Sequence, residues 1–358
     1  MWLRKVSVEV TSDDNSVHML FGYKSTDTPD TPTHRIDFEY HSVMGWAGDY
    51  GTITLYNLSS EEIKSLQRKT HGALNIKLSV GYVDSSGISD YMYDSEDATL
   101  TVFVGSITNA VSYKRLPENI VHLYCVPQQV SQVTQISLGD ITIGAQAGAT
   151  LEDAIKLLTS QAGLGYKTSG VSSDLLSYKF SRGRAFHGTF IQEVQKLCAE
   201  FNMNFSLQPS FIEFYPSSIA SADIVNEIAT EREPIVVTPG QVIENPVAGI
   251  AILELSMNLN PTIMPGMLID VSKLISPDGV DTTQNYISYN LGYAGNIDNT
   301  VMANGMSSLY QIVSLVHHGS THAQNFQTDI TGNYGVDTTM GAIERNWREW
   351  CASAYGDS

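Results

Sequence analysis

The stretch "SLYQIVSLVHHGSTHAQNFQTDITG" (residues 308–332) holds three of the chain's nine histidines within six positions. Successive side chains of a strand point to opposite faces of a sheet, so His317 and His318 cannot both bind one ion. His322 lies across the small-residue turn "GST" and could face one of them. Two imidazoles without a nearby carboxylate or thiolate fall short of the usual zinc ligand set. The stretch therefore predicts a β-hairpin rather than a metal site, with a pH-sensitive histidine contact as a further possibility.

The apolar residues before the turn assign the two faces of the first strand. Strict alternation places His317 on one face and His318 on the other, as long as the strand runs unbroken. The residues predicted to share the face of His317 are Leu309, Val313 and Leu315, and those predicted to share the face of His318 are Tyr310, Ile312 and Val316.

Composition sets the class of the molecule. The chain has 358 residues, of which 42 % are hydrophobic and 16 % charged, which predicts a globular protein of two or three domains. The chain has 20 Lys and Arg residues and 38 Asp and Glu residues, which gives a net charge of −18. This negative charge repels nucleic-acid phosphates and anionic lipid. We therefore expect no binding of DNA along its surface.

Cysteine usage and hydropathy indicate a cytoplasmic origin. Cys125, Cys198 and Cys351 are sparse and contain no CxxC pair, which favours a reducing compartment over a disulfide framework. The first residues lack the apolar core of a signal peptide, and no apolar run reaches the roughly 18–20 residues of a membrane span. The sequence thus predicts a soluble protein, made in a cytoplasm and without a membrane span.

Residues 1–128 have the alternation of half-buried strands, which predicts a barrel or sandwich. One helix interrupts them: in "LSSEEIKSLQRKTHG", Ser59 and Glu62 have the spacing of a capping box, and Gly72 is suited to end the helix. An acidic loop (83–98) joins two of the strands. The predicted strands are "KVSVEV" (5–10), "HRIDFEY" (34–40), "GTITLYN" (51–57), "ALNIKLSVGY" (73–82), "ATLTVFVGSI" (98–107) and "NIVHLYCV" (119–126).

Residues 129–235 contain two related helix–strand units. "TLEDAIKLLTSQAGLGY" (150–166) and "TFIQEVQKLCAEFNMNF" (189–205) align without a gap. Each has a threonine at the N-cap, a polar residue at the third helical position and apolar residues at helical spacing. Gly163 and Asn202 occupy the same place in the two units, where a left-handed residue ends a helix. We predict a compact α/β module.

Residues 236–335 return to strands. "AILELSMNLNP" alternates, and Pro265-Gly266 predicts a turn before the next strand. Residues 276–306 form a long insertion without clear periodicity, of a length that is usually functional or mobile. The tail, 336–358, is expected to be a short helix with one apolar stripe, which either contacts a partner or packs on its own domain. The candidate partner residues are Ile343, Trp347 and Trp350.

Catalytic motifs are absent from the sequence. It lacks a GxSxG elbow, HExxH, GxxxxGK[ST] and GxGxxG. The acid pairs Glu61-Glu62 and Glu152-Asp153 lie in the first turns of predicted helices, where the helix dipole favours negative charge. Cys198 lies on the apolar side of its helix and is expected in the core. Arg182 and Arg184 form a small basic spot, either a surface hairpin or an anion site. We predict no enzyme, no catalytic residue, no cofactor and no metal.

Two stretches carry a family resemblance. The first, in 51–112, is "GTITLYNLSSEEIKSLQ…LNIKLSVGY…LTVFVGSITNAVSYK". The second, in 247–332, is "VAGIAILELSMNLNPTIMPGMLIDVS…GMSSLYQIVSLVHHGSTHAQNFQTDI". Together they resemble the baseplate hub proteins of tailed phages, especially the Mu-like and related contractile-tail hubs. The insertion 276–306 and the two-tryptophan tail are not part of that pattern.

The resemblance implies a fold and a function. The fold would be α+β and mostly β, with two tail-tube-like antiparallel β-barrel domains (1–128 and 236–335) and the α/β module between them. Three copies would form a ring in the virion baseplate, assembled in the host cytoplasm. The ring would adapt the sixfold tail tube to the threefold central spike and let DNA pass through its lumen. The implied partners are two further copies, the central spike, and the tail tube or its initiator, with tape-measure and baseplate wedge proteins as further contacts.

Three other functions are weighed against the phage hub. The hub of a tailocin or a secretion-type contractile device would share the fold. A carbohydrate-binding β-sandwich adhesin could use the four Trp and 18 Tyr as stacking platforms, but needs no duplicated α/β module. A metal-dependent cell-wall hydrolase would need His317, His318 and His322 on one ion, which the alternation disfavours.

Overall fold

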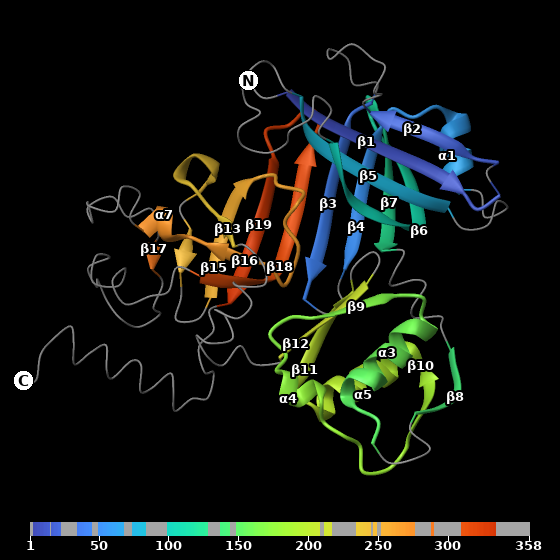
Figure 1. Cartoon of the computed structure of the whole chain (residues 1–358). Helices are drawn as coiled ribbons and strands as arrows, with labels where there is room; N and C mark the ends of the chain where they lie inside the picture. Colours follow the sequence, from blue (N-terminus) through green and yellow to red (C-terminus); the bar gives the residue numbers. More distant parts are fainter. Residues whose placement is uncertain are drawn as a thin grey trace, which may run out of the picture.

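The structure is a computed structural model, and its described residues form three sheets, the largest of 14 strands (Figure 1). The fold is α+β and mostly β, as the sequence predicts. No described helix has the length and apolar character needed to cross a membrane. The structure describes residues 3–14, 16–22, 34–44, 49–67, 74–83, 99–127, 137–143, 148–207, 211–216, 234–244, 246–248, 252–275, 288–289 and 309–333.

The first β segment contributes seven antiparallel strands in the order β3-β4-β7-β6-β5-β1-β2. Six of them were predicted; β2, a short strand paired with β1, was not. Helix α1 (Ser60–Gln67) has the predicted capping box, in which Glu62 N–H donates to Ser59 Oγ at 3.3 Å and Ser59 N–H to Glu62 Oε2 at 2.7 Å. The strands are β1 (Leu3–Ser12), β2 (His18–Gly22), β3 (Ile36–Val43), β4 (Tyr50–Tyr56), β5 (Leu74–Val83), β6 (Thr99–Arg115) and β7 (Glu118–Pro127).

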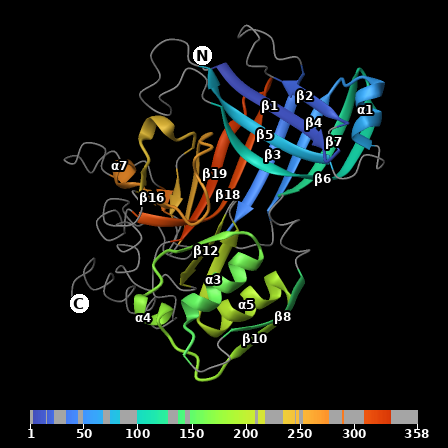
Figure 2. The same ribbon diagram turned by 45° about the vertical axis from the view of Figure 1, so that its right-hand side comes forward.

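The core of this segment lies between two crossing layers of the same sheet. Strands β1, β2 and β5 cross over β3, β4 and β7 (Figures 1 and 2). The inward residues of each strand are apolar at every second position, which is the pattern that buries one face of a strand. The buried side chains include Val6, Val8, Val10, Ile76, Leu78, Phe38, Ile53, Leu55 and Leu123.

The second β segment has its own apolar core, which includes Leu253, Leu255, Ile269 and Ile330. Most of its pairs are antiparallel, but β13–β16 and β14–β17 are short parallel pairs that the sequence did not indicate. The predicted turn is present, with Gly266 at φ +89°. The elements are β13 (Ile235–Val236), η2 (Pro239–Gln241), β14 (Val247–Ala248), β15 (Ile252–Asn258), β16 (Leu268–Asp270), α7 (Ser272–Ile275), β17 (Ser288–Tyr289), β18 (Leu309–Ser320) and β19 (Phe326–Asn333).

The two β segments share one sheet. Strand β18 pairs with β3 in antiparallel register from Ser314 opposite Val43 to Ser320 opposite Asp37. The resemblance implies a β-barrel for each segment; in the described residues the edge of β3 also pairs with the edge of β18. Pairing removes two exposed edges at once, since an unpaired edge leaves backbone donors and acceptors open. The order β15-β19-β18-β3-β4-β7-β6 therefore runs through both segments.

The middle of the chain folds into a separate small core below the sheet (Figure 1). Both predicted helices are present, each with its capping box: Thr150 with Asp153, and Thr189 with Gln192. Gly163 (φ +67°) and Asn202 (φ +51°) have the left-handed backbone expected of both. The elements are β8 (Ser137–Ile143), α3 (Leu151–Gln161), β9 (Gly165–Thr168), α4 (Ser173–Leu176), β10 (Arg184–Thr189), α5 (Phe190–Glu200), β11 (Met203–Leu207) and β12 (Phe211–Pro216).

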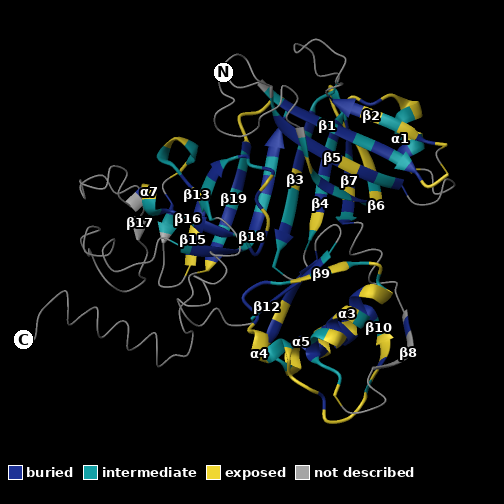
Figure 3. Ribbon diagram, in the orientation of Figure 1, coloured by how far each residue is buried: buried dark blue, intermediate teal, exposed yellow. Residues whose placement is uncertain are grey.

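Buried residues alternate with exposed ones along many of the elements (Figure 3). In α5, for example, Phe190, Val194 and Leu197 are buried while Gln195 and Lys196 are exposed. The pattern has helical spacing, so one stripe of α5 packs on the sheet of the module. The domain boundaries 129 and 236 stay predictions, and residues 128–136 and 217–233, next to them, lie outside the described ranges.

Candidate functional site

The shared sheet has one buried face and one polar face, and we call the latter the outer face. Successive residues of each strand lie on opposite faces of the sheet, and Phe38, Ile53, Leu123 and Leu315 lie on the buried face. Their neighbours in sequence point the other way and are partly or fully exposed. The registers of five strand pairs place the outward residues side by side from β15 to β7. The outer face consists of Glu254, Ser256, Asn258, Gln327, Asp329, Thr331, Val316, His318, Ser320, Asp37, Glu39, His41, Tyr50, Thr52, Thr54, Tyr56, His122 and Tyr124.

Carboxylates and hydroxyls dominate this face. Asp37 and Glu39 of β3, Asp329 of β19 and Glu254 of β15 supply negative charge across both β segments. Arg35 lies at the edge of the group, 3.2 Å from Asp37 and 3.7 Å from Glu118. Carboxylates outnumber basic side chains on this face, as they do in the whole chain. Their negative charge disfavours the binding of polyanions to the outer face.

The seam between β3 and β18 is held by a carboxylate. Asp37 accepts hydrogen bonds from Ser320 Oγ at 2.5 Å, Tyr56 Oη at 2.6 Å and Arg35 Nη2 at 3.2 Å. Burial and the hydrogen bond to Asp37 raise the pKa of Tyr56 to about 12. Thr321 adds a two-way contact with Ile36: Ile36 N–H donates to Thr321 Oγ1, and Thr321 N–H donates to Ile36 O, both at 3.0 Å. Side chains thus reinforce the backbone pairing of the two segments.

The histidine stretch forms the predicted hairpin, β18–β19, and the prediction of opposite faces is confirmed. His317 is buried and lies 2.9 Å (Nδ1) from Thr328 Oγ1; burial lowers its pKa to about 4, opposed by a hydrogen bond to the backbone of Ile263. His318 lies on the outer face, 2.9 Å (Nε2) from Asp329 Oδ2. No local sequence pattern indicates Asp329 as a neighbouring carboxylate, because it lies diagonally across the strands: the register pairs His318 with Gln327 and Val316 with Asp329.

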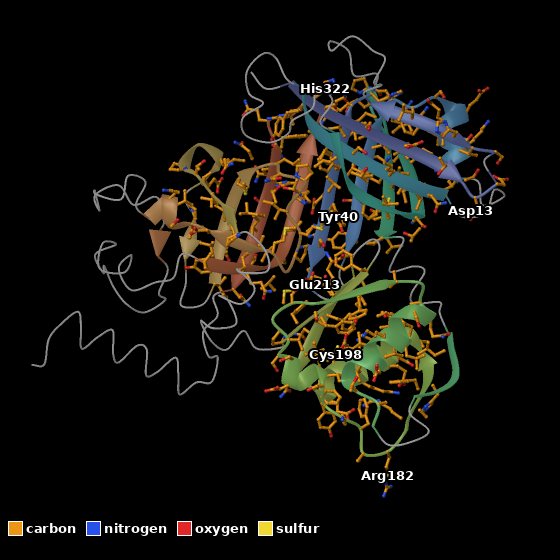
Figure 4. The ribbon with its side chains drawn as sticks, viewed as in Figure 1. Asp13, Tyr40, Arg182, Cys198, Glu213 and His322 are labelled. Atoms are coloured by element: carbon orange, nitrogen blue, oxygen red, sulfur yellow. The ribbon has the colours of Figure 1, made fainter. Side chains whose placement is uncertain are left out.

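The turn of the hairpin is longer than predicted. Strand β18 continues through Ser320, and the turn spans 321–325 instead of "GST". His322 is exposed in that turn, and its Nδ1 lies 2.8 Å from Thr321 Oγ1. Figure 4 shows it at the top of the molecule, above Tyr40, whose ring stacks on that of His317. Among the described residues no three His, Cys, Asp or Glu side chains gather as metal ligands. The three histidines are therefore not brought together.

The predicted faces of the residues that precede the turn are wrong for the first half of β18. The register shifts between Ile312 and Ser314, which marks a bulge at Val313. A bulge adds one residue to one strand and so reverses the alternation on one side of it. As a result Tyr310 and Ile312 are buried on the same side as Leu315 and His317, rather than opposite them.

A cavity of about 90 Å³ lies behind His317, where the three parts of the chain meet. Ser42 Oγ and Val43 N–H donate to Asp49 at 3.2 and 2.8 Å, and burial raises the pKa of Asp49 to about 6 despite these hydrogen bonds. Burial also raises the pKa of Tyr40. Sequence alone offered no signal for Asp49, since a lone acid in a glycine-rich turn reads as solvent-exposed. The lining includes Tyr40, Ser42, Asp49, Leu207, Ile263 and His317.

The remaining candidates have structural roles in the described residues. Cys125 and Cys198 are buried thiols whose pKa values are raised to about 12 by burial, which disfavours the reactive thiolate. Glu152 pairs with Lys156 at 2.8 Å in the first turn of α3. Arg184 pairs with Glu200 at 2.6 Å, whereas Arg182 is exposed at the end of the module (Figure 4).

Two predictions fall outside the described residues. The partner stripe of Ile343, Trp347 and Trp350 lies there, as does the insertion 276–306 apart from β17. Both therefore stay predictions.

The fold is similar to solved tail proteins. It matches a tail protein from Neisseria meningitidis MC58 at TM-score 0.48 and 8 % identity, covering 96 % of this chain and 99 % of that one. It matches the 43 kDa tail protein of prophage MuSo2 from Shewanella oneidensis at 0.47 and 6 %, covering 91 % and 96 %. It matches an Escherichia coli component of the type VI secretion system at 0.45 and 11 %, covering 85 % and 75 %. No family model and no curated sequence matches. A functional assignment therefore rests on the residues and the sheet described above.

Proposed function

We propose that this chain is the structural hub subunit of a phage-tail baseplate. Three copies form a ring that adapts the sixfold tail tube to the threefold central spike. The proposal starts from the hub-like motifs in 51–112 and 247–332. The same ring could serve a tailocin or a secretion-type contractile device, which would use the same geometry.

One observation carries the proposal: a single sheet runs through both β segments, from β15 to β7. Two β segments, each with its own apolar core and joined edge to edge at β3–β18, give each chain two side-by-side units. Three such chains would present six units to a hexameric tube and three chains to a trimeric spike. Symmetry adaptation of this kind needs two related units per chain, and the shared sheet supplies a rigid link between them.

The outer face supports a lumen through which DNA passes. A channel for DNA should not bind the DNA it conducts, and carboxylates repel phosphate. Asp37, Glu39, Asp329 and Glu254 lie on one continuous face, whereas the other face of the same strands is buried. We place the part of this face around Asp37 and Glu39 toward the lumen and assign the chain no catalytic step.

The other assignments follow from the ring. The partners are two further copies, the central spike, and the tail tube or its initiator, with tape-measure and wedge proteins as outer contacts. The site of action is the virion baseplate, after assembly in the host cytoplasm. We assign the stripe of Ile343, Trp347 and Trp350 to one of these partners, because tryptophan is over-represented among interface hot spots.

The test is the absolute mass in solution, measured by light scattering coupled to size exclusion from 1 to 100 µM, together with DNA binding by filter retention. We expect three 39.2 kDa chains and no retention of DNA. A monomer throughout this range, or retention of DNA at physiological salt, would contradict the ring or the lumen, respectively. Binding to a glycan array by a monomer would favour the adhesin instead.

A further inference from the structure

Among the residues that the structure describes, no strand pairs with one edge of β6 at the end of the β6–β7 ribbon. Strand β5 pairs with β6 only as far as Ser106, whereas β7 accompanies β6 to Arg115. Helix α1 contacts this part of β6, and the Gln67 amide donates to Ala110 O at 3.5 Å and to Ser112 Oγ at 2.9 Å. Unpaired strand edges are templates for pairing with another chain.

Apolar and basic side chains gather at this end. Val111 is 41 % exposed, Tyr113 43 % and Leu116, in the turn, 89 %. Arg115 shares their face of β6 and lies opposite Glu118, which pairs with Arg35 at 3.7 Å, and Lys114 is exposed on the other face. Large apolar side chains exposed together mark an interaction surface, and the two cations select an acidic partner.

The opposite end of the outer face has the complementary chemistry. A hollow of about 280 Å³ between β14, β15, β18 and β19 is lined by Glu244, Glu254 and Asp329, and by no Lys or Arg. Ile243 and Ile252 are 45 % and 47 % exposed at the same end. One end of the sheet is therefore apolar and basic, and the other end is apolar and acidic.

We propose that the β6–β7 ribbon end of one copy docks on the β14–β15 end of the outer face of a second copy. The two surfaces differ, so the contact is head to tail, and such contacts close into a ring when the rotation between copies allows it. A second copy is the favoured occupant because the same chain carries both complementary ends. This inference rests on the proposed ring and names the surfaces that close it.

The first test reverses the charge of the ribbon. In Lys114→Glu/Arg115→Glu the ribbon should repel the acidic hollow, and the dissociation constant of the ring should rise at least about tenfold. The matched control, Lys167→Glu/Lys179→Glu, makes the same charge change on exposed lysines of the α/β module and should keep the wild-type mass. Circular dichroism checks that both variants are folded.

The second test restores the attraction. Glu244→Lys/Glu254→Lys alone should also dissociate the ring, and the fourfold variant that combines both reversals should reassemble it. A wild-type ring that is unaffected by either reversal would overturn this contact while leaving the proposed hub intact. A folded wild-type monomer at every concentration would overturn both. Dissociation by the ribbon variant without rescue by the fourfold variant would assign the ribbon to a different acidic surface and reject the hollow.

Discussion

Ser320 Oγ donates a 2.5 Å hydrogen bond to Asp37 Oδ1 across 283 residues of sequence. The bond joins the last residue of β18 to the second residue of β3, at the place where the two β segments become one sheet. Tyr56 and Arg35 donate to the same carboxylate, so Asp37 gathers three donors at the seam.

Replacing that carboxylate should weaken the seam. Asp37→Ala leaves the three donors without their acceptor, and we expect a loss of about 2–3 kcal/mol in the free energy of unfolding. The control is Glu39→Ala on the same face of β3, where the side chain is 50 % exposed and pairs with His41. It should cost less than about 1 kcal/mol. Urea unfolding at pH 7 measures both, and equal losses would show that Asp37 is only a surface charge.

Gly319 tests the packing of the same seam. A Cβ at this position would lie 2.6 Å from Phe326 Cδ2 and 2.9 Å from Phe38 Cζ, inside two rings of the core. We expect Gly319→Ala to cost about 1–3 kcal/mol by overpacking. Gly240→Ala is the control, since its Cβ meets no heavy atom within 4 Å, and it should stay within about 0.5 kcal/mol of wild type. Similar stability of the two variants would mean that the rings move aside freely.

The local features of this fold could be predicted from the sequence. Capping boxes, left-handed residues at helix ends and alternating strands involve residues a few positions apart, and Thr150, Thr189, Gly163 and Asn202 occur as predicted. The separation of His317 from His318 likewise follows from strand geometry alone.

The features that could not be predicted from the sequence are non-local or depend on one irregular residue. The pairing of β3 with β18 and the contact of His318 with Asp329 depend on register, which no local pattern specifies. The bulge at Val313 reversed the alternation upstream of it. Asp49 is half-buried where three parts of the chain meet around a cavity.

The paired capping boxes offer a test of local energetics. Thr150 Oγ1 accepts from Asp153 N–H at 3.2 Å, and Thr189 Oγ1 accepts from Gln192 N–H at 3.4 Å. Thr150→Ala and Thr189→Ala should each cost about 1 kcal/mol. Replacement of either threonine by serine keeps the hydroxyl and should cost only a few tenths. If alanine and serine variants melt at the same temperature, the cap hydrogen bonds do not stabilise the helices.

The cavity behind His317 should give two opposing dependences of stability on pH. His317 has a pKa of about 4 when folded and 6.5 ordinarily, so the unfolded chain binds more protons between these values. Its contribution to stability is therefore lost as pH falls from 6.5 to 4. Asp49 has a pKa of about 6 when folded and 3.8 ordinarily, so the folded chain binds more protons, and stability is lost as pH rises from 4 to 6.

The two effects oppose each other in the wild-type protein, and single variants should separate them. In Asp49→Asn the free energy of unfolding should fall more steeply with acid than in wild type, by up to about 1.4 kcal/mol per pH unit between pH 6 and 4. In His317→Gln the difference from wild type should have the opposite sign over the same range. Urea unfolding at half-unit steps from pH 4 to 7.5 measures the slopes, and comparison with wild type removes the background of other titrating groups. Parallel curves for all three proteins would show that neither group changes its protonation on folding, and that the cavity is open to water.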